Sequence, residues 1–499
     1  MPKLEEDEVF LDHQICSKKP LIPYRYFIMF MVLAATTVLS AVRNTINVAI
    51  IAMVDDPTDE HSTGTINTTR NQQFTTQQFD WNQHEQGIIL GSYYYTYTAI
   101  QIYAGNLSDK FNVVHLMALT QLIVTLCTFI TPLAVSFSIY YMITIRMIMG
   151  LVQGVTFPCL YNMIENWFPP TELGFAQGLA AAGCDLGSAL TSIFTAWISE
   201  RGIWGGWPAA FYTMGMFNLV FGLVWMAMVT RDPFSNRFVS DYEKRQLYHI
   251  VQNTKTEQPK IKSTPWIKMI TSLPLWSVII TKGIIGLAYS VINSKIPVYL
   301  DSVLGYKLEN NGLINGLLYI GSGSTQLTCG PISKYLIARG LIGRTATRKL
   351  FETISLSGII VSLIAVCYLG DNAHLIVTCL IMSMVFHGVN LGGDVPIVAE
   401  MAPGLIGTTF GFANTIASAS GFIAPALIAV ILGDDAGSQA KWILAFQIVA
   451  GLQFVALILF GIFATAEPQS WGKVENLHLD EPVSRLSQES EKIQEINNN

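Results

Sequence analysis

The chain has 499 residues, of which 51% are hydrophobic and only 13% are charged. Soluble domains carry about a quarter charged residues, so this composition excludes an ordinary soluble protein and indicates a membrane protein. The formal net charge of -6 gives no sign of nucleic-acid binding.

About twelve mostly apolar segments are long enough to cross a bilayer, which takes roughly 20 residues each. An even number of spans places both tails on the same side of the membrane. We therefore predict an all-α membrane protein of about 12 transmembrane helices. The segments begin near Tyr24, Gly87, Val113, Ile139, Gly174, Pro208, Thr271, Gly312, Leu350, His374, Leu405 and Trp442.

The distribution of charge predicts the orientation, because basic residues in short loops mark the cytoplasmic side. Lys and Arg precede the first span, cluster between the eighth and ninth spans, and recur in the 231–268 linker. The 55–86 loop is instead rich in Asp and Glu. Both tails are expected in the cytoplasm, and Asn67 in this loop is a glycosylation sequon on the opposite side.

The chain divides into two halves that repeat each other. Gly105 and Ser108, after the second span, correspond to Gly330 and Ser333 after the eighth. Paired repeats are typical of secondary transporters, so we predict two six-helix halves. The expected parts are a cytoplasmic tail 1–23, a first half 24–230 with the outer loop 55–86, a cytoplasmic linker 231–270, a second half 271–466 and a cytoplasmic tail 467–499.

Two short patterns predict local structure. Ser240 and Glu243 have capping-box spacing, which indicates a short helix in the linker. Gly150 and Gly154 form a small-xxx-small pair of the kind that lets two membrane helices approach closely.

Two arginines lie inside apolar spans at similar predicted depths. Arg43 is in the first span and Arg146 in the fourth. A charge in the membrane interior costs about 2.5–3.5 kcal/mol even on the lenient insertion scale, so each arginine needs water, a partner or an anionic ligand. Guanidinium groups bind carboxylate and phosphate in bidentate geometry. An anion-binding site is predicted; structural salt bridges to Asp or Glu are the alternative.

Acidic residues elsewhere in the spans are candidates for ion coupling. Gln153 lies seven residues after Arg146, on nearly the same helix face, and cannot carry a proton. Asp185, near the middle of the fifth span, is the first candidate, with a fixed salt bridge to an arginine as the alternative. Asp394 and Glu400 in the tenth span are further candidates, although Glu400 lies near the cytoplasmic end, where a structural role is expected.

The tenth span has a local break in its predicted helix. Gly392, Gly393 and Pro396 interrupt it, and broken helices can expose backbone groups to a cavity. Asn390 is a candidate cavity-lining residue there, whereas His387 is interpreted as a buried, satisfied histidine.

Other polar side chains in the spans have simpler interpretations. Tyr93 and Tyr97, one helical turn apart, either pack against neighbours or line the cavity with their hydroxyl groups. Lys282 and Lys295 are expected to snorkel toward opposite ends of the seventh span.

Several motifs resemble the major facilitator superfamily and, within it, the anion:cation symporter family. "GNLSDKF" is similar to the superfamily loop between helices 2 and 3, which implies a conformational gate at Gly105, Asp109 and Lys110. "RMIMGLVQGVTFPCLYNMIENWFPP" and "AEMAPGLIGTTFGFANT" resemble family motifs in helix 4 and at the helix 10–11 junction. The resemblance implies alternating access around a central cavity and gives anion binding to Arg43 and Arg146.

The chain departs from the resembled family at one position that bears on mechanism. Members usually carry a glutamate tied to proton coupling where this sequence has Gln153. We hypothesise that Asp185 or Asp394 has taken over that role.

The predicted function is secondary active transport of a small organic anion or phosphate, coupled to a proton gradient, a sodium gradient or the membrane potential. A non-transporting anion receptor and an anion channel are the alternatives. The sequence lacks a Gly-rich nucleotide-binding loop, a His-Glu metal motif and a nucleophile elbow, so a primary pump or an enzyme is not expected. We expect no cofactor or bound metal, a functional monomer, no nucleic-acid partner, and residence in the plasma membrane or in endolysosomal or secretory vesicles.

Overall fold

The computed structural model describes residues 23–54, 78–168, 170–245, 265–370, 372–402, 405–433 and 435–472. The sequon at Asn67 lies outside these residues, as do both tails and most of the 55–86 loop. Asp109 and Lys110 lie on a described helix, but their side chains are outside the described part.

The described chain is helical almost throughout. The long helices of the first half are α2 (Tyr24–Met53), α3 (Gln83–Lys110), α4 (Val113–Phe137), α5 (Ile139–Gln153), α6 (Thr156–Trp167), α7 (Pro170–Glu200) and α8 (Trp207–Met228). Those of the second half are α11 (Leu273–Ser302), α12 (Leu308–Ala338), α13 (Arg344–Tyr368), α14 (Ala373–Gly388), α15 (Asp394–Met401), α16 (Ile406–Leu432) and α17 (Gln439–Phe463). Short pieces are η2 (Ile203–Gly205), α10 (Trp266–Ile270) and η3 (Val389–Gly392).

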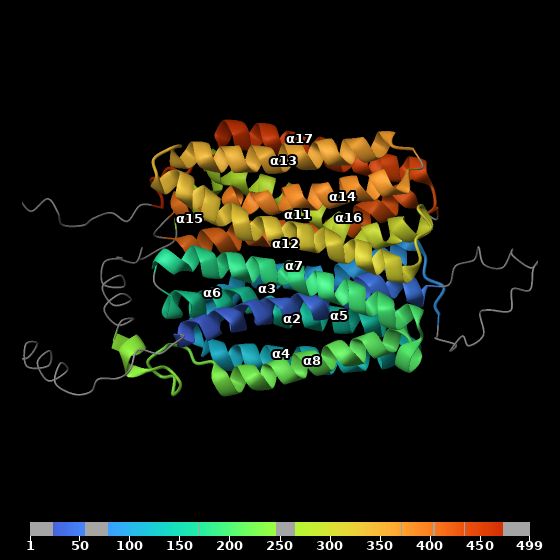
Figure 1. Cartoon of the computed structure of the whole chain (residues 1–499), viewed down its shortest axis with the longest axis horizontal. Helices are drawn as coiled ribbons and strands as arrows, with labels where there is room; N and C mark the ends of the chain where they lie inside the picture. The colour runs from blue at the N-terminus through green and yellow to red at the C-terminus, as the bar shows by residue number, and fades with distance from the viewer. Residues whose placement is uncertain are drawn as a thin grey trace, which may run out of the picture.

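These helices confirm the predicted all-α membrane fold. Within the described residues, ten helical segments are long and apolar enough to cross a membrane, with α5 and α6 counted as one and α14 to α15 as another. The helices α3 and α12 are more polar than these but run alongside them through the bundle (Figure 1). These two with the other ten give the twelve spans that the sequence predicts.

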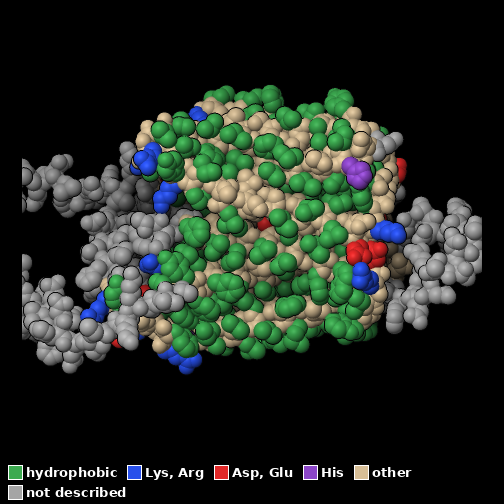
Figure 2. Space-filling model, in the orientation of Figure 1, with side chains coloured by type: hydrophobic (Ala, Val, Ile, Leu, Met, Phe, Trp, Pro, Cys, Tyr) green, Lys and Arg blue, Asp and Glu red, His purple; other side chains and the backbone are tan. Residues whose placement is uncertain are grey.

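The bundle has an apolar outer surface with charges gathered at its two ends. Figure 2 shows hydrophobic side chains along the sides of the helices, with Lys and Arg mainly at the left end. We call this end, where α2 begins, the Tyr24 end, and the opposite end, where α2 finishes, the Met53 end. Large exposed side chains such as Leu126, Leu133 and Leu223 make up part of this surface, which suits contact with lipid.

Helices approach most closely where glycine replaces a side chain. A Cβ on Gly150 of α5 would overlap the backbone oxygen of Tyr93 on α3. One added to Gly154 would overlap the side chain of Ile100. The small-xxx-small pair is therefore a contact surface between α3 and α5, as the sequence predicts, and it brings Tyr93 close to the helix that carries Arg146.

The linker is tied to the start of α2. Ser240 Oγ accepts a hydrogen bond from the Glu243 backbone N–H at 3.3 Å, and residues 241–245 are helical. The Glu243 carboxylate accepts hydrogen bonds from the backbone N–H groups of Tyr24 (2.8 Å) and Arg25 (3.0 Å). The first turn of a helix has N–H groups without intrahelical partners, so the linker glutamate caps α2.

Candidate anion-binding site

The structure brings Arg43 and Arg146 together in the interior of the first half. Arg43 is on α2 and Arg146 on α5, and the two side chains are only 8% and 3% exposed. Arg146 donates a hydrogen bond from Nη1 to the backbone oxygen of Arg43 at 3.1 Å. Two charges placed on separate helices by the sequence therefore share one buried site.

Neither guanidinium is paired with a carboxylate of the described residues. The ion pairs of the described residues lie elsewhere, and the Nε atoms of both arginines are buried without a hydrogen-bond partner. Arg43 donates from Nη2 to Ser40 Oγ at 3.2 Å. Because no described carboxylate forms a salt bridge with either arginine, this arrangement favours the anion-binding interpretation over structural salt bridges.

Aromatic rings border the arginines. The Arg146 guanidinium lies 5.2 Å from the ring centre of Tyr93, and that of Arg43 lies 6.0 Å from the ring centre of Tyr94. Ring faces attract cations but provide no counter-charge. Tyr93 also stacks on Tyr97 at 5.5 Å between centroids. The rings hold the cationic heads in place and leave their charge available to an anion.

Gln153 is joined to this aromatic group. Tyr93 donates a hydrogen bond from its hydroxyl group to Gln153 Oε1 at 2.8 Å, while Gln153 Nε2 is buried without a partner among the described atoms. The candidate residues Tyr93, Tyr97 and Gln153 thus lie together. Asn390 does not join them: it lies in η3, where its backbone oxygen accepts a hydrogen bond from Gly393.

Asp185 on α7 connects the two halves rather than pairing with an arginine. Its carboxylate accepts hydrogen bonds from the Tyr289 hydroxyl group on α11 at 3.0 Å and from Gln326 Nε2 on α12 at 2.9 Å. The His387 ring stacks on Tyr289 with 4.9 Å between centroids and is hydrogen-bonded to Ser322. Asp185 is therefore fully engaged in a network that crosses from one half to the other.

The sequence interpretation missed the partners of Asp185. A signal for one of them was present, because Tyr289 and Asn293 lie four residues apart, on one face of α11. Both side chains make polar contacts with first-half helices.

The halves are joined at the Met53 end. Asn47 donates to Asn293 Oδ1 at 3.0 Å, and Asn293 donates to Asn44 Oδ1 at 3.3 Å. Nearer the surface, Arg201 pairs with Glu309 at 3.2 Å. These contacts join α2 to α11 and the end of α7 to the start of α12, so polar bonds hold the bundle closed there.

At the Tyr24 end, the described contacts between the halves include apolar ones. Tyr161 of α6 meets Phe410 of α16 edge to face at 5.3 Å. Such a contact has no directional hydrogen bond to break when the halves separate.

The tenth span is broken where the sequence predicts it. After α14 ends at Gly388, η3 follows, and Gly393 departs from helical geometry with φ -107° and ψ -90° before α15 starts at Asp394. Asp394 pairs with Lys282 Nζ at 3.2 Å. Glu400 makes two hydrogen bonds with Arg348, at 3.0 and 2.6 Å, which is the structural role expected near that end of the helix.

The prediction that Lys282 and Lys295 snorkel toward opposite ends was wrong. Lys282 turns inward to Asp394, and Lys295 is wholly buried, with no hydrogen-bond partner for its Nζ atom among the described residues. Snorkelling applies to lysines at the edge of a lipid-facing surface, whereas other helices surround both of these side chains.

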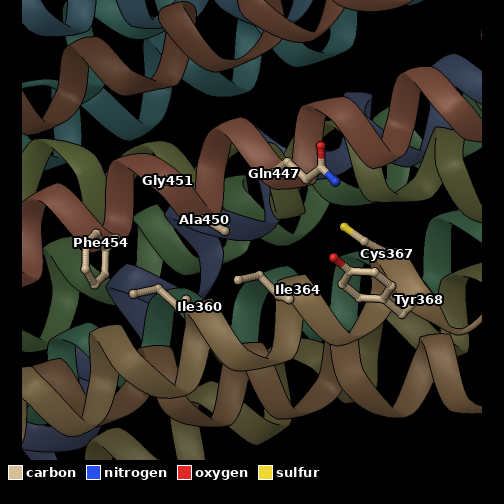
Figure 3. Close-up of a pocket in the computed structure, with 8 residues that line it drawn as sticks. All are labelled: Ile360, Ile364, Cys367, Tyr368, Gln447, Ala450, Gly451 and Phe454. Carbon is tan, nitrogen blue, oxygen red and sulfur yellow. The ribbon is translucent and has the colours of Figure 1, made fainter.

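A separate groove lies between α13 and α17 (Figure 3). Its volume is about 410 Å³, and its lining residues are Ile360, Ile364, Cys367, Tyr368, Gln447, Ala450, Gly451 and Phe454. Tyr368 is 82% and Phe454 54% exposed, so the groove belongs to the outer surface. Because its lining includes no charged side chain, it does not provide an anion site.

Comparison with known proteins identifies the class. The model of the Major Facilitator Superfamily matches residues 26–425, and the chain belongs to that superfamily. Among solved structures, a proton:xylose symporter covers 89% of this chain and 97% of its own, with a TM-score of 0.65 and 10% identity. A likeness at this identity shows the fold alone. The chain is thus a multi-pass membrane protein of transporter type and not an enzyme.

The curated relatives narrow the group. Human sialin is 27% identical over 458 residues, which is 90% of each chain. Sodium-dependent phosphate transport protein 1 of Oryctolagus cuniculus is 26% identical over 93% of this chain and 98% of its own. An uncharacterized transporter of Caenorhabditis elegans is 30% identical over 80% of each chain. These relatives place the chain in the anion:cation symporter group, as its motifs predict.

Proposed function

We propose that the protein is a secondary active transporter of a small organic anion or phosphate, and that Arg43 and Arg146 bind the negative charge of the cargo. The observation that carries this proposal is the pair of buried guanidinium groups, for which the described part of the chain provides no carboxylate partner. A buried charge is tolerated when it is paired, and a carboxylate or phosphate cargo would complete the pairing.

We propose that transport proceeds by alternating access, with the halves separating at the Tyr24 end. The Met53 end is held by the Asn47–Asn293 bond and the Arg201–Glu309 pair. We propose that the Tyr24 end faces the cytoplasm, with both tails on that side. In this arrangement the cargo would leave the arginines toward the cytoplasm once the halves separate at the Tyr24 end.

Asp185 is proposed to connect cargo binding to movement of the halves. It lies on a first-half helix and bonds to Tyr289 and Gln326 of the second half. Gly105, Asp109 and Lys110 at the end of α3 are proposed as a conformational gate, and Asn67 as a glycosylation site. The protein is expected to act as a monomer in the plasma membrane or in an endolysosomal or secretory vesicle.

Uptake by proteoliposomes tests the proposal. Purified protein would be given labelled phosphate, glutamate, sialic acid or an aromatic anion under an imposed proton gradient, sodium gradient or membrane potential. We expect one probe to accumulate, and Arg146→Ala to weaken its binding roughly 10- to 150-fold, because a hydrogen bond to a charged group is worth about 1.5–3 kcal/mol.

Arg339→Ala is the matched control, since Arg339 is exposed at the Tyr24 end and should behave as the wild type. Binding of a probe without translocation would support a receptor instead. Flux that never exceeds equilibration would support a channel.

A further inference from the structure

Three charged side chains meet on helices that carry neither arginine. Lys282 lies nine residues into α11, Glu352 eight residues into α13, and Asp394 seven residues before the end of α15. At 1.5 Å per residue, each is roughly 10 to 14 Å from the Tyr24 end of its helix. The second half thus has a charged cluster of its own inside the membrane-spanning region.

The helix break before Asp394 builds this cluster. Because a helix starts there, the Asp394 N–H has no intrahelical partner, and it donates instead to Glu352 Oε2 at 3.0 Å. The preceding Gly393 lies so close to Glu352 that a Cβ would overlap the carboxylate. Asp394 Oδ2 accepts from Lys282 Nζ at 3.2 Å. Backbone and side chains therefore hold the two carboxylates next to each other.

The cluster has unused capacity for a cation. Glu352 Oε1 and Asp394 Oδ1 are both buried without a hydrogen-bond partner among the described atoms. Glu352 is 0% and Asp394 1% exposed, while the Lys282 side chain is 14% exposed. Lys282 is thus the member of the cluster that reaches the accessible surface.

The charges of the cluster do not balance. One ammonium group faces two carboxylates, which leaves one negative charge in the membrane interior, where even the lenient scale gives about 2.5–3.5 kcal/mol for an isolated charge. The nearby Arg348 is already committed to Glu400, Ser333 and the Gly392 carbonyl group.

The remaining titratable neighbour is a histidine on another helix. His387 on α14 is hydrogen-bonded to Ser322 and stacked on Tyr289, so it is directed at the network around Asp185. No described residue supplies the missing positive charge.

A proton suits this site better than a metal ion. A hard metal ion such as Ca²⁺ takes six or more oxygen ligands, and only two carboxylate oxygens are free. The Lys282 ammonium also occupies the cation position beside Asp394. A proton needs a single oxygen atom, and Glu352 Oε1 provides it.

We propose that Glu352 binds the proton that is transported together with the anion, and that the Asp394–Lys282 ion pair is the fixed counter-charge beside it. This inference rests on the proposed transport function. Protonation makes the cluster neutral, and a hydroxyl at Oε1 provides a donor where two acceptors have no partner.

The position of Lys282 links the cluster to the boundary between the halves. Its Nζ atom lies 6.0 Å from the ring centre of Phe410, and Phe410 packs on Tyr161 of the first half. Separation of the halves at the Tyr24 end would therefore uncover Lys282 and give water access to Glu352.

The experiment compares two transport modes of the full chain in proteoliposomes, with labelled phosphate, glutamate and sialic acid as probes. Glu352→Gln removes the proton site but keeps the volume of the side chain. We expect it to retain exchange of the labelled anion across the membrane and to lose at least tenfold in accumulation driven by a pH gradient. Glu467→Gln, an exposed position, should match the wild type in both modes.

Infrared spectroscopy of the purified protein gives a second, cargo-independent readout. The wild type should show the carbonyl band of a protonated carboxyl group that disappears as the pH is raised, and Glu352→Gln should lack it. Glu352→Asp keeps a carboxyl group on a shorter chain, so it should move the pH at which the band disappears, and it serves if Glu352→Gln does not fold.

The outcomes distinguish failure of the proton site from failure of the transport function on which it rests. Wild-type accumulation by Glu352→Gln, or a carboxyl band that does not respond to pH, overturns the proton site and leaves anion transport standing. If Arg146→Ala loses both exchange and accumulation, the anion site is supported independently of the proton site. A wild-type protein that exchanges none of the three probes overturns the transport function and, with it, the coupled proton.

Discussion

Replacement of Gln153 by glutamate would place a titrating charge near the two arginines. Gln153 is seven residues from Arg146, roughly 10.5 Å along the helix axis, and its amide oxygen accepts from Tyr93. An anion held at Arg146 would be repelled from an ionised glutamate at that distance by about 1.6 kcal/mol with an effective dielectric constant near 20. This energy corresponds to roughly fifteenfold weaker binding.

The sign of the pH dependence follows from which form carries the charge. At high pH the new carboxylate is ionised and the anion binds weakly; as the pH falls the group is protonated and affinity returns to that of the wild type. The wild-type amide does not titrate, so position 153 adds no pH dependence to the wild type, and the ratio of variant to wild-type affinity isolates the effect of the new carboxylate from that of the coupled proton. Sialic acid is a suitable probe, because an α-carboxyl group ionises near pH 3.5 and keeps its charge across the neutral range.

The assay is concentration-dependent uptake or binding of labelled sialic acid at a series of pH values for the wild type, Gln153→Glu and Gln153→Leu. Gln153→Leu also removes the acceptor for Tyr93 but adds no charge, so any loss it causes should be independent of pH. If the ratio of Gln153→Glu to wild-type affinity does not change with pH, or if the ratio for Gln153→Leu changes in the same way, the electrostatic reasoning about this site is refuted.

Two further variants test how the halves and helices are joined. Asp185→Asn and Tyr289→Phe should each lower the thermal midpoint of the purified protein. The double variant should lose less stability than the sum of the two losses, with an interaction energy of about 0.5–3 kcal/mol. Simple additivity would show that the hydrogen bond between the two side chains contributes nothing. Gly150→Ala should disrupt the contact of α5 with Tyr93 and lower folded yield, whereas Gly461→Ala, which faces open space, should not. Equal yields would contradict the packing described for α5.

Local signals in the sequence predicted most of the fold. The predicted starts of the spans fell within six residues of the helix starts, because a bilayer demands long apolar runs that are visible without any knowledge of packing. The break in the tenth span was also predictable, since Gly392, Gly393 and Pro396 each weaken a helix at their own position.

The sequence could not predict which polar groups meet across the bundle. Asp185 was recognised as a candidate, but its partners Tyr289 and Gln326 come from helices more than 100 positions along the chain. The ion pair between Lys282 and Asp394 was missed for the same reason, because the two residues lie on different helices, α11 and α15. The two arginines could be selected as candidate anion-binding residues from the sequence, because a charge in an apolar span is unusual whatever its partners are.

Arg43 and Arg146 have no carboxylate partner among the described residues, and this bears on how the proposed transporter would behave without cargo. When both ends close, water leaves the path, and a guanidinium group without a counter-ion in a dry interior is much less stable than a paired one. Under the proposed function the cargo supplies that counter-ion, so the barrier to reorientation is highest when the site is vacant. Exchange of anion between the two sides, which never requires the vacant protein to reorient, should therefore be faster than net uptake.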